Sequence, residues 1–331
     1  MTSRKSAIGR KVLVTGSRGK SSIVRYLHAA FQHAGLESYA RITGVVPREL
    51  GPAGVRTISR TAGAHVEEMR WWLNQLPAST DAVILENSAI TQEFQNLAER
   101  WLQPDLTVLC NVLPDHQEAW GDGKGCAAKV LGSGIPRHGK VVLSAELRAD
   151  PYLLQLLDKR CCQLVFVDAV DEIEPDFHAT NLGLALVAAG QLGIATAPSL
   201  QAMLDVKPDC YDFRVLQLRG ADLAMAFSAN DINSTRTLFQ SLCWSEQETR
   251  LIYNHRKDRP GRLNSFINWL VNTPWREVLI IGDKPRKLPV SARYLKIKNG
   301  EELQKIFHPG DQVFGCGNIA GLPLSLITTL D

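Results

Sequence analysis

The chain has 331 residues, of which 45% are hydrophobic and 21% charged, so it is long enough for two globular α/β domains. Its formal net charge of +3 gives no support to a nucleic-acid-binding protein, which would carry a concentrated basic patch. No apolar stretch has the length of a transmembrane helix, which argues against an integral membrane protein.

A glycine-rich loop near the start of the chain lies between a predicted strand and a predicted helix. The segment Lys11–Ser22 reads KVLVTGSRGKSS; Val12–Val14 predicts a buried strand, and apolar residues at helical spacing in 23–34 predict a helix. Backbone N–H groups of such a loop and the helix N-terminus bind phosphate, Lys20 adds a mobile positive charge, and the Ser21 hydroxyl can bind Mg²⁺. We therefore predict a nucleoside triphosphate site with the short pattern T-G-x-x-G-K-S; the alternative is an ordinary strand-to-helix turn.

Strand and helix patterns alternate through the first 206 residues. Further strands are predicted at 82–86, 106–112, 141–144 and 164–167, and helices at 65–76 and 179–192. This alternation is typical of a mostly parallel sheet with helices on both faces. The stretch 44–63 is rich in Gly, Pro and Arg and has no periodicity, so we predict a long surface loop there.

A break at Lys207-Pro208-Asp209 predicts a domain boundary near residue 207. Strand patterns then recur at 215–218, 223–228, 251–254, 278–282 and 312–315, and helical patterns at 234–242, 262–271 and 301–307. The expected fold class is α/β. A P-loop ATPase domain with a mostly parallel sheet would occupy residues 1–206, and a smaller Rossmann-like α/β domain would occupy residues 207–331.

Polar residues at two other strand ends could complete the nucleotide site. Glu86 ends one predicted strand, and Asp115 and His116 follow another. Because the carboxyl ends of parallel strands meet at one edge of a sheet, these side chains should lie beside the phosphate loop, where Glu86 could hold Mg²⁺. Two alternatives remain: a helix cap at Asn87 or Ser88 with Glu86 favouring the helix dipole, and an ordinary turn at Asp115 and His116.

Six segments, spread in order over nearly the whole chain, carry a family resemblance. They are VTGSRGKSS, the strand that ends at Glu86, NVLPDHQEAWG, FSANDINST, NHRKDRPGR and VFGCGNIAG. Together they resemble the Mur ligase superfamily, ATP-dependent enzymes that join a carboxylate to an amine, and most closely the ligase subunit of poly-γ-glutamate synthase (the CapB type).

The resemblance implies ATP and Mg²⁺ as cofactors. The residues around the ATP phosphates would be Gly16, Ser17, Arg18, Gly19, Lys20, Ser21 and Ser22. The resemblance places Ser21, Glu86 and His116 at the metal ions and gives Lys20, Glu86 and His116 catalytic roles.

The resemblance also implies roles outside the phosphate loop. Asn181 matches an asparagine that lies near adenine, and Arg214 matches an arginine that reaches ATP when the two domains close. Lys129 lies where several Mur ligases carry a carbamoylated lysine on the second metal, although an ordinary exposed helix lysine explains it better.

Candidate substrate residues lie in the C-terminal part. Asn230 and Asp231 stand near the position of a family aspartate that this chain lacks, with a helix cap as the alternative. Arg256 and Arg259 follow a predicted strand, and arginine forks suit carboxylates, so we hypothesise that they orient a glutamate-like substrate; the alternative is a solvated basic loop. Because the phosphate loop begins at Gly16, no UDP-sugar domain is expected before it.

The cysteines and the N-terminus bear on localisation. The seven cysteines form no C-x-x-C pair, which favours reduced thiols over zinc or disulfides. The polar start MTSRKSAIGRK is unlike a signal peptide, so we expect a cytoplasmic protein.

The expected function is that of an ADP-forming ligase that makes an amide bond through an acyl phosphate, on glutamate or a γ-glutamyl-like amino acid. Its partners would be a small-molecule carboxylate and an amine, without nucleic acid; a homo-oligomer or partner subunits of a biosynthetic complex are left open. The alternatives are a P-loop small-molecule kinase or nucleotide hydrolase, and a nucleotide-binding regulatory protein with an inactive site.

Overall fold

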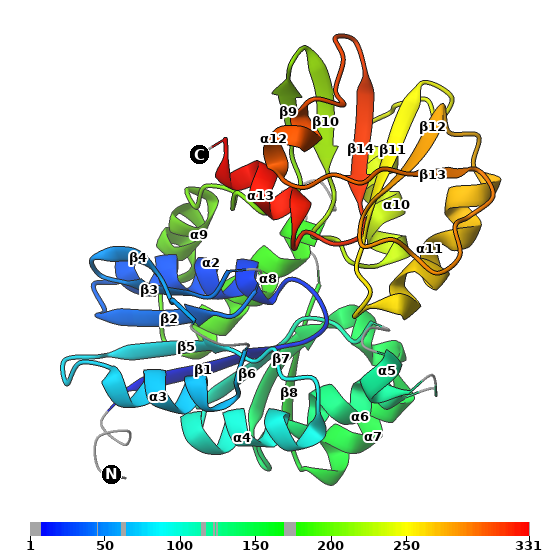
Figure 1. Cartoon of the computed structure of the whole chain (residues 1–331). Helices are drawn as coiled ribbons and strands as arrows, with labels where there is room; N and C mark the ends of the chain where they lie inside the picture. The colour runs from blue at the N-terminus through cyan, green and yellow to red at the C-terminus, as the bar shows by residue number, and fades with distance from the viewer. Residues whose placement is uncertain are drawn as a thin grey trace. The chain divides into compact units, whose positions relative to one another are not determined.

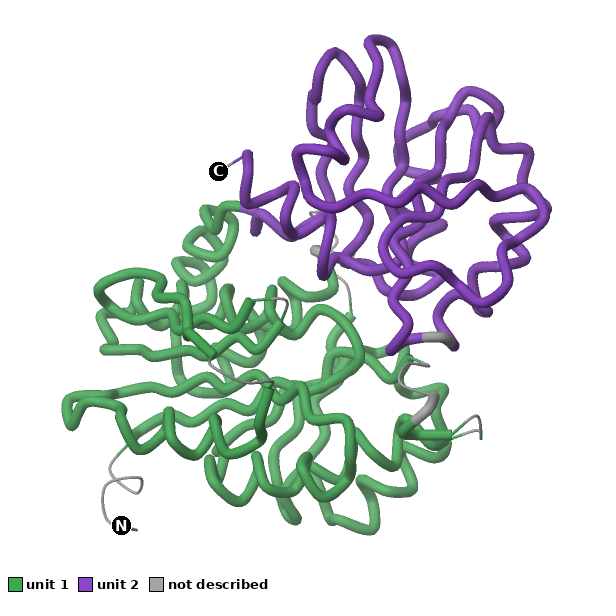
Figure 2. Tube along the Cα trace, viewed as in Figure 1, with its two compact units in different colours: residues 1–207 green, residues 208–331 purple. Residues whose placement is uncertain are grey.

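A computed structural model describes residues 8–44, 46–60, 64–113, 117–121, 123, 125–168 and 177–330. The chain divides into two compact units, Met1–Lys207 (unit 1) and Pro208–Asp331 (unit 2), shown in Figure 2. Each unit is built on its own β-sheet. None of the helices in the described ranges has the length and apolar composition of a membrane span.

Unit 1 contains an eight-stranded sheet in the order β4-β3-β2-β5-β1-β6-β7-β8. Neighbouring strands from β2 to β8 are parallel, whereas β3 pairs antiparallel with both β2 and β4. The strands are β1 (Arg10–Thr15), β2 (Ser38–Ile42), β3 (Arg48–Gly51), β4 (Gly54–Thr57), β5 (Ala82–Glu86), β6 (Leu106–Leu109), β7 (Lys140–Ser144) and β8 (Gln163–Val167).

Helices cover both faces of this sheet (Figure 1). One face carries α2 (Lys20–His33), α8 (Phe177–Gln191) and α9 (Thr196–Leu204). The other carries α3 (Glu67–Gln75), α4 (Gln92–Leu102), α6 (Cys126–Ser133) and α7 (Pro151–Lys159), and the connections include α5 (Gln117–Trp120) and the short 3₁₀ helix η1 (Ala145–Ala149).

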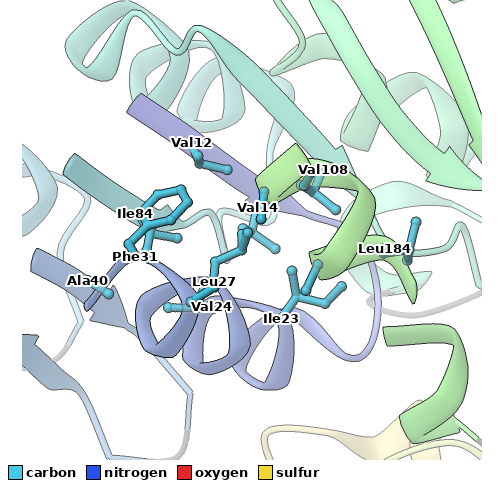
Figure 3. Packing of buried hydrophobic residues seen from close by; sticks show 14 of the residues in the cluster. Val12, Val14, Ile23, Val24, Leu27, Phe31, Ala40, Ile84, Val108 and Leu184 are labelled. Carbon is cyan, nitrogen blue, oxygen red and sulfur yellow. The ribbon is translucent and has the colours of Figure 1, made fainter. Parts of the chain in front are cut away.

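Alternation along β1 assigns its side chains to two cores. Val12 and Val14 pack with the apolar face of α2 and with α8, as Figure 3 shows. Leu13 points to the opposite face and packs with α3 and α4. Because β1 is buried on both faces, its sequence is a continuous apolar run, as expected for a central parallel strand.

Unit 2 contains a six-stranded sheet in the order β13-β12-β11-β14-β10-β9, in which β9 and β10 are antiparallel and the other neighbours parallel. Its strands are β9 (Val215–Leu218), β10 (Ala221–Met225), β11 (Thr249–His255), β12 (Glu277–Gly282), β13 (Ala292–Tyr294) and β14 (Gln312–Cys316). Its helices are α10 (Ile232–Ser241), α11 (Pro260–Asn272), α12 (Gly300–Gln304) and α13 (Leu322–Thr328).

The core of unit 2 is aromatic on the face covered by α10 and α11. Phe239 lies 4.8 Å from Trp275 and 5.2 Å from Phe314 between ring centroids, in edge-to-face geometry. On the other side of this sheet, α12 packs against α13 (Figure 1). Edge-to-face pairs of this kind add stability beyond the apolar area that they bury.

The prediction of one long surface loop over 44–63 is wrong. Within it, β3 and β4 form an antiparallel hairpin that extends the sheet from β2. All four residues of β4 are exposed, so the hairpin leaves no alternating apolar pattern in the sequence. The strand predicted at 106–112 is also too long, because β6 ends at Leu109. Beyond Leu109 the chain turns toward the glycine-rich loop, where Asn111 O accepts a hydrogen bond from Ser17 N.

Candidate active site

Two glycines shape the loop between β1 and α2. Gly16 has a φ of 132° and Gly19 a φ of 82°, values that side chains of L-residues rarely allow. A Cβ atom on Gly16 would lie 3.0 Å from Cys110 Cβ, and one on Gly19 would lie 2.3 Å from Asn181 Oδ1. Both positions therefore require glycine, for conformation and for space.

The first turn of α2 is suited to an anion. No side chain caps this helix in the described structure, and its first turn holds no acidic residue. The first N–H groups of a helix have no partner within the helix and carry its positive partial charge. A phosphate at this position would accept these hydrogen bonds.

A segment after β6 fixes the glycine-rich loop. Asn111 Oδ1 accepts a hydrogen bond from Arg18 N at 2.9 Å, and Asn111 Nδ2 donates to Arg18 O at 3.3 Å. Ser17 Oγ donates to Leu113 O and accepts from Leu113 N, both at 2.9 Å. The segment after β6 thus holds the loop in one conformation. The first backbone N–H groups of α2 are left available for a ligand. Asn111 was not predicted as a site residue from sequence, although it follows an apolar run and begins the segment NVLPDHQEAWG.

Lys20 lies folded back over the loop. Its Nζ donates to Gly16 O at 2.6 Å and to Ser17 O at 3.2 Å. A lysine in this position can transfer its hydrogen bonds from carbonyl oxygens to the oxygens of a bound phosphate.

Ser21 and Glu86 form the polar pair predicted from the strand ends. Ser21 Oγ donates to Glu86 Oε2 at 3.0 Å, and the same oxygen accepts from Thr43 N at 3.0 Å. Glu86 is only 2% exposed. Carboxylate and hydroxyl oxygens are the hard ligands that Mg²⁺ takes, so the pair fits a divalent cation bound to a nucleotide phosphate.

The segment after Glu86 is fixed by a buried amide network. Asn87 Nδ2 donates to Gln95 Oε1 at 2.6 Å, and Thr15 Oγ1 donates to the same oxygen at 3.3 Å. Gln95 Nε2 in turn donates to Ala89 O at 2.7 Å. The N-cap of α4 is Thr91, so neither Asn87 nor Ser88 caps this helix. A small pocket lies between this network and the glycine-rich loop, lined by Gly16, Ser17, Lys20, Asn87, Ser88, Ala89, Ile90, Gln95, Trp120 and Leu131.

Arg41 places a buried positive charge near Glu86. It lies on β2, 1% exposed, and its Nη2 donates to Glu68 Oε2 at 2.6 Å. Burial lowers the pKa of Arg41, and the carboxylates of Glu68 and Glu86 act in the opposite direction. The position of this arginine near Glu86 was not predicted from sequence, because a charged residue inside a short strand obscures the strand.

Four further predicted residues of unit 1 differ in what the structure says of them. Asn181, on α8, is 7% exposed and lies against Gly19, so it is part of the wall of the phosphate loop. Lys129, on α6, is exposed. Asp115 and His116 lie outside the described residues. Among the described residues, no group of three or more His, Cys, Asp or Glu side chains is arranged to hold a metal ion.

Two predicted residues of unit 2 already have structural partners. Asp231 caps α10, where its Oδ1 accepts from Ser234 N at 2.8 Å. Asn230 Oδ1 accepts from Arg262 Nη1 at 2.7 Å, and Arg262 also contacts Asn318 Oδ1 in the glycine-rich turn after β14.

The predicted arginines of unit 2 differ in their surroundings. Arg256 donates to both carboxylate oxygens of Asp258, through Nε at 3.0 Å and Nη2 at 2.6 Å, so one fork of its guanidinium group is already occupied. Arg259 directly precedes α11. Arg214 precedes β9, and its Nε is buried without a hydrogen-bond partner among the described residues.

Two family models match this chain. The Mur ligase middle domain matches residues 14–187, and the poly-gamma-glutamate synthase CapB C-terminal domain matches residues 211–331. PGA synthase CapB of Bacillus subtilis (strain 168) is 24% identical over 97% of this chain and 90% of that protein. The capsule biosynthesis protein CapB of Bacillus anthracis is 25% identical over 80% of this chain and 61% of that protein.

Solved structures show the same fold. MurF from Acinetobacter baumannii matches with a TM-score of 0.69 and 11% identity, over 99% of this chain and 77% of that chain. FolC of E. coli in complex with DHPP and ADP matches with a TM-score of 0.68 and 13% identity, over 99% and 90%. The bifunctional folylpolyglutamate synthase/dihydrofolate synthase of Yersinia pestis, complexed with AMPPNP and Mn ion, matches with a TM-score of 0.67 and 15% identity, again over 99% and 90%.

Proposed function

Since this chain belongs to the Mur ligase family, we propose that its glycine-rich loop binds ATP and that Lys20, Ser21 and Glu86 serve the activation of a carboxylate. The protein is an ATP-dependent, ADP-forming ligase that makes an amide bond and acts on glutamate. The observation that carries the residue assignment is the contact of Ser21 with the buried carboxylate of Glu86 at the end of β5. A small-molecule kinase or nucleotide hydrolase is not favoured by these relationships.

The first chemical step joins two anions. A carboxylate oxygen of the acid substrate attacks the γ-phosphorus of ATP, the bond from that phosphorus to the bridging oxygen breaks, and ADP leaves behind an acyl phosphate. Lys20 Nζ would move its hydrogen bonds from the loop carbonyls to phosphate oxygens and offset their charge. A divalent cation, which we propose to be Mg²⁺, supplies further charge neutralisation when bound, and Ser21 and Glu86 would hold it.

The second step forms the amide. The amine attacks the acyl carbon, inorganic phosphate leaves, and the amine nitrogen loses a proton. Because acyl phosphates hydrolyse, water must be kept away between the steps. We propose that Arg214 and His116 contribute as the family resemblance implies, Arg214 at the nucleotide and His116 at a second metal ion, and that Lys129 supports that ion.

We also propose that the reaction takes place in the cytoplasm on free small molecules. All seven cysteines are free in the structure, as in proteins of reducing compartments. ATP, the proposed energy source, is available there. Light scattering of the purified chain measures whether copies of it form a homo-oligomer.

Substitution of Glu86 tests the site. In Glu86→Gln the carboxylate loses its charge but keeps its shape, so we expect kcat for ADP formation to fall about 100-fold or more, the loss typical of one electrostatic group at a reacting centre. Binding of ADP without metal should change less than about tenfold, because the loop contacts remain. Glu93→Gln, an exposed carboxylate in the first turn of α4, is the control and should keep full activity. Equal activity of Glu86→Gln and Glu93→Gln would remove Glu86 from the mechanism.

A further inference from the structure

The small pocket beside Lys20 is lined by side chains of two kinds. Its volume is about 30 Å³, which is about the space that one water molecule occupies in the liquid. The polar side chains of the lining are Ser17, Lys20, Asn87, Ser88 and Gln95, and the apolar ones are Ala89, Ile90, Trp120 and Leu131. Because Ser17 and Lys20 belong to the glycine-rich loop, water in this pocket would stand next to the proposed phosphate site.

The polar side chains on the loop side of the pocket already have hydrogen-bond partners. Ser17 Oγ donates to Leu113 O and accepts from Leu113 N, both at 2.9 Å. Lys20 Nζ donates to Gly16 O at 2.6 Å, and in the proposed reaction it exchanges that partner for a phosphate oxygen. These two side chains therefore do not need a water molecule in the pocket.

The polar side chains after β5 also have partners. Asn87 Oδ1 accepts from Ala89 N at 3.2 Å, and Asn87 Nδ2 donates to Gln95 Oε1 at 2.6 Å. Gln95 Nε2 donates to Ala89 O at 2.7 Å, and Thr43 Oγ1 donates to Ser88 Oγ at 2.7 Å. A buried water molecule makes about three hydrogen bonds. Because the polar groups of the lining bond to other protein groups, a water molecule in this pocket gains little.

Trp120 has the largest side chain among the described residues that line this pocket. It ends α5, and its Nε1 donates to Ile90 O at 2.7 Å, which ties α5 to the segment that follows β5. Trp120 is half-buried and Ile90 is 36% exposed, whereas Asn87 and Gln95 are fully buried. Trp120 and Ile90 therefore lie toward the solvent side of the pocket, where an indole provides a flat apolar wall and one donor that anchors it.

The proposed acyl phosphate has two competing fates. Attack of the amine on the acyl carbon gives the amide and inorganic phosphate. Attack of water on the same carbon gives back the acid together with inorganic phosphate, so the net result is hydrolysis of ATP to ADP and phosphate without a product. A side chain that keeps water away from the reacting atoms slows the second fate and leaves the first unaffected.

We propose that the wall formed by Trp120 and Ile90 keeps water from the acyl phosphate, and that Trp120 thereby sets how many ATP molecules are consumed for each amide bond. This rests on the proposed ligase function. The indole ring is the barrier, and its N–H group fixes the ring to Ile90 O. Trp120 takes no part in the transfer of the phosphoryl group; it favours the amine over water at the acyl carbon.

The test measures ADP and amide in the same reaction of the full chain, with Mg-ATP and with glutamate as both acid and amine. Trp120→Ala should raise the number of ADP molecules per amide bond by about tenfold, because the barrier to attack by water falls relative to the barrier to attack by the amine. A second reaction contains N-acetylglutamate, which has no free amine. There Trp120→Ala should release ADP faster than the unaltered chain does.

Three variants separate this role from a structural one, since a damaged fold lowers ADP and amide in proportion and leaves their ratio unchanged. Trp71→Ala is the control, because Trp71 lies on α3, is 52% exposed and does not line the pocket; its ratio should equal that of the unaltered chain. Trp120→Phe keeps a ring without the donor, so its ratio should stay near that of the unaltered chain. Ile90→Ala should raise the ratio by less than Trp120→Ala, and it decides the test if Trp120→Ala does not fold.

Failure of this inference and failure of the ligase function give different results. Equal ratios of ADP to amide in Trp120→Ala and Trp71→Ala would overturn the role of Trp120, and so would a ratio in Trp120→Phe as high as in Trp120→Ala. ADP release by Trp120→Ala without any acid would overturn it as well, because water would then attack ATP itself. In each case the unaltered chain still forms the amide. ADP release by the unaltered chain that needs no acid would instead reject the ligase function.

Discussion

At the scale of single residues, Gly19 links the backbone of the phosphate loop to its neighbour α8. Two separate features exclude any other residue at this position. Its φ is 82°, and an added Cβ atom would lie only 2.3 Å from Asn181 Oδ1. The first costs about 1–2 kcal/mol wherever it occurs, and the second requires Asn181 to move.

Gly19→Ala should therefore lower the free energy of unfolding by more than the dihedral cost alone and should weaken ADP binding about tenfold or more. Gly35→Ala is a matched control, because Gly35 has a φ of 77° with open space around it. We expect Gly35→Ala to cost about 1–2 kcal/mol and to leave ADP binding unchanged. Chemical denaturation and calorimetric titration of both variants check this; equal losses in the two would mean that Asn181 does not constrain the loop.

His28, on the buried side of α2, makes stability depend on pH. Its Nδ1 lies 3.1 Å from Ser38 Oγ, and burial lowers the pKa of His28 from 6.5 to about 4. Between these values the unfolded chain binds a proton that the folded chain does not, so stability is present above pH 6.5 and is lost as the pH falls toward 4.

The loss due to His28 should be about 2 kcal/mol between pH 7 and pH 4.5. His28→Gln can still contact Ser38 and does not titrate. Urea unfolding at both pH values measures the free energy of unfolding. Between pH 7 and pH 4.5 that free energy should fall by about 2 kcal/mol less in His28→Gln than in the unaltered chain. The same pH dependence in both would assign the acid sensitivity to other groups.

The sequence could predict those site residues whose contacts are local in the chain, and not those whose contacts depend on distant segments. Lys20 and Ser21 belong to a strand–loop–helix order contained in a few consecutive residues, and Glu86 ends a buried strand. Asn111 holds the loop only because β6 is the neighbour of β1 in the sheet, and Arg41 approaches Glu86 only because β2 is the neighbour of β5. No local sequence pattern determines the order of the strands in a sheet. The role of His116 stays a prediction.

At the scale of elements, buried ion pairs tie the strands of unit 2 together. Arg250 on β11 donates to Asp311 Oδ2 at 2.5 Å, to Glu277 Oε2 at 3.0 Å and to Ile306 O at 2.8 Å. Burial acts to raise the pKa of Asp311, but the hydrogen bond from Arg250 and its other donors outweigh burial and lower it. These contacts connect β11 to β12 and to the turn before β14.

Arg250→Met should therefore destabilise unit 2 by about 3–5 kcal/mol, because it leaves Asp311 buried with a charge. Arg276→Met removes a partner of the same carboxylate, at 3.1 Å, but that side chain is 52% exposed, and we expect a loss below about 1 kcal/mol. Hydrogen exchange of the β11 and β14 amides measures unit 2 by itself. A small loss in Arg250→Met would show that the pair adds little.

Elements with strong periodicity could be predicted, and those whose pattern is broken could not. The strand 82–86 matches β5, and the helix after the phosphate loop matches α2, since their apolar residues are continuous or evenly spaced. β2 contains the buried Arg41, and β4 is fully exposed, so neither carries a usual strand signature. Such strands form because neighbouring strands offer hydrogen bonds, which is a tertiary effect.

At the scale of the whole molecule, the predicted α/β class and Mur ligase resemblance are confirmed. Both depend on motifs spread along the chain, since no single segment is specific enough. The two units have separate hydrophobic cores, and each carries a mostly parallel sheet. The chemistry of the proposed ligase needs ATP, a carboxylate and an amine together, so the dependence of turnover on all three is its defining property.

The most direct test is ADP release from Mg-ATP by the purified chain, with glutamate or a glutamyl oligomer as the acid and amino acids as the amine, followed by mass spectrometry of the products. We predict that ADP appears only when both an acid and an amine are present, and that one amide bond forms for each ADP. ADP release that is indifferent to the amine, or a phosphorylated final product, would contradict the ligase function and leave only the shared fold.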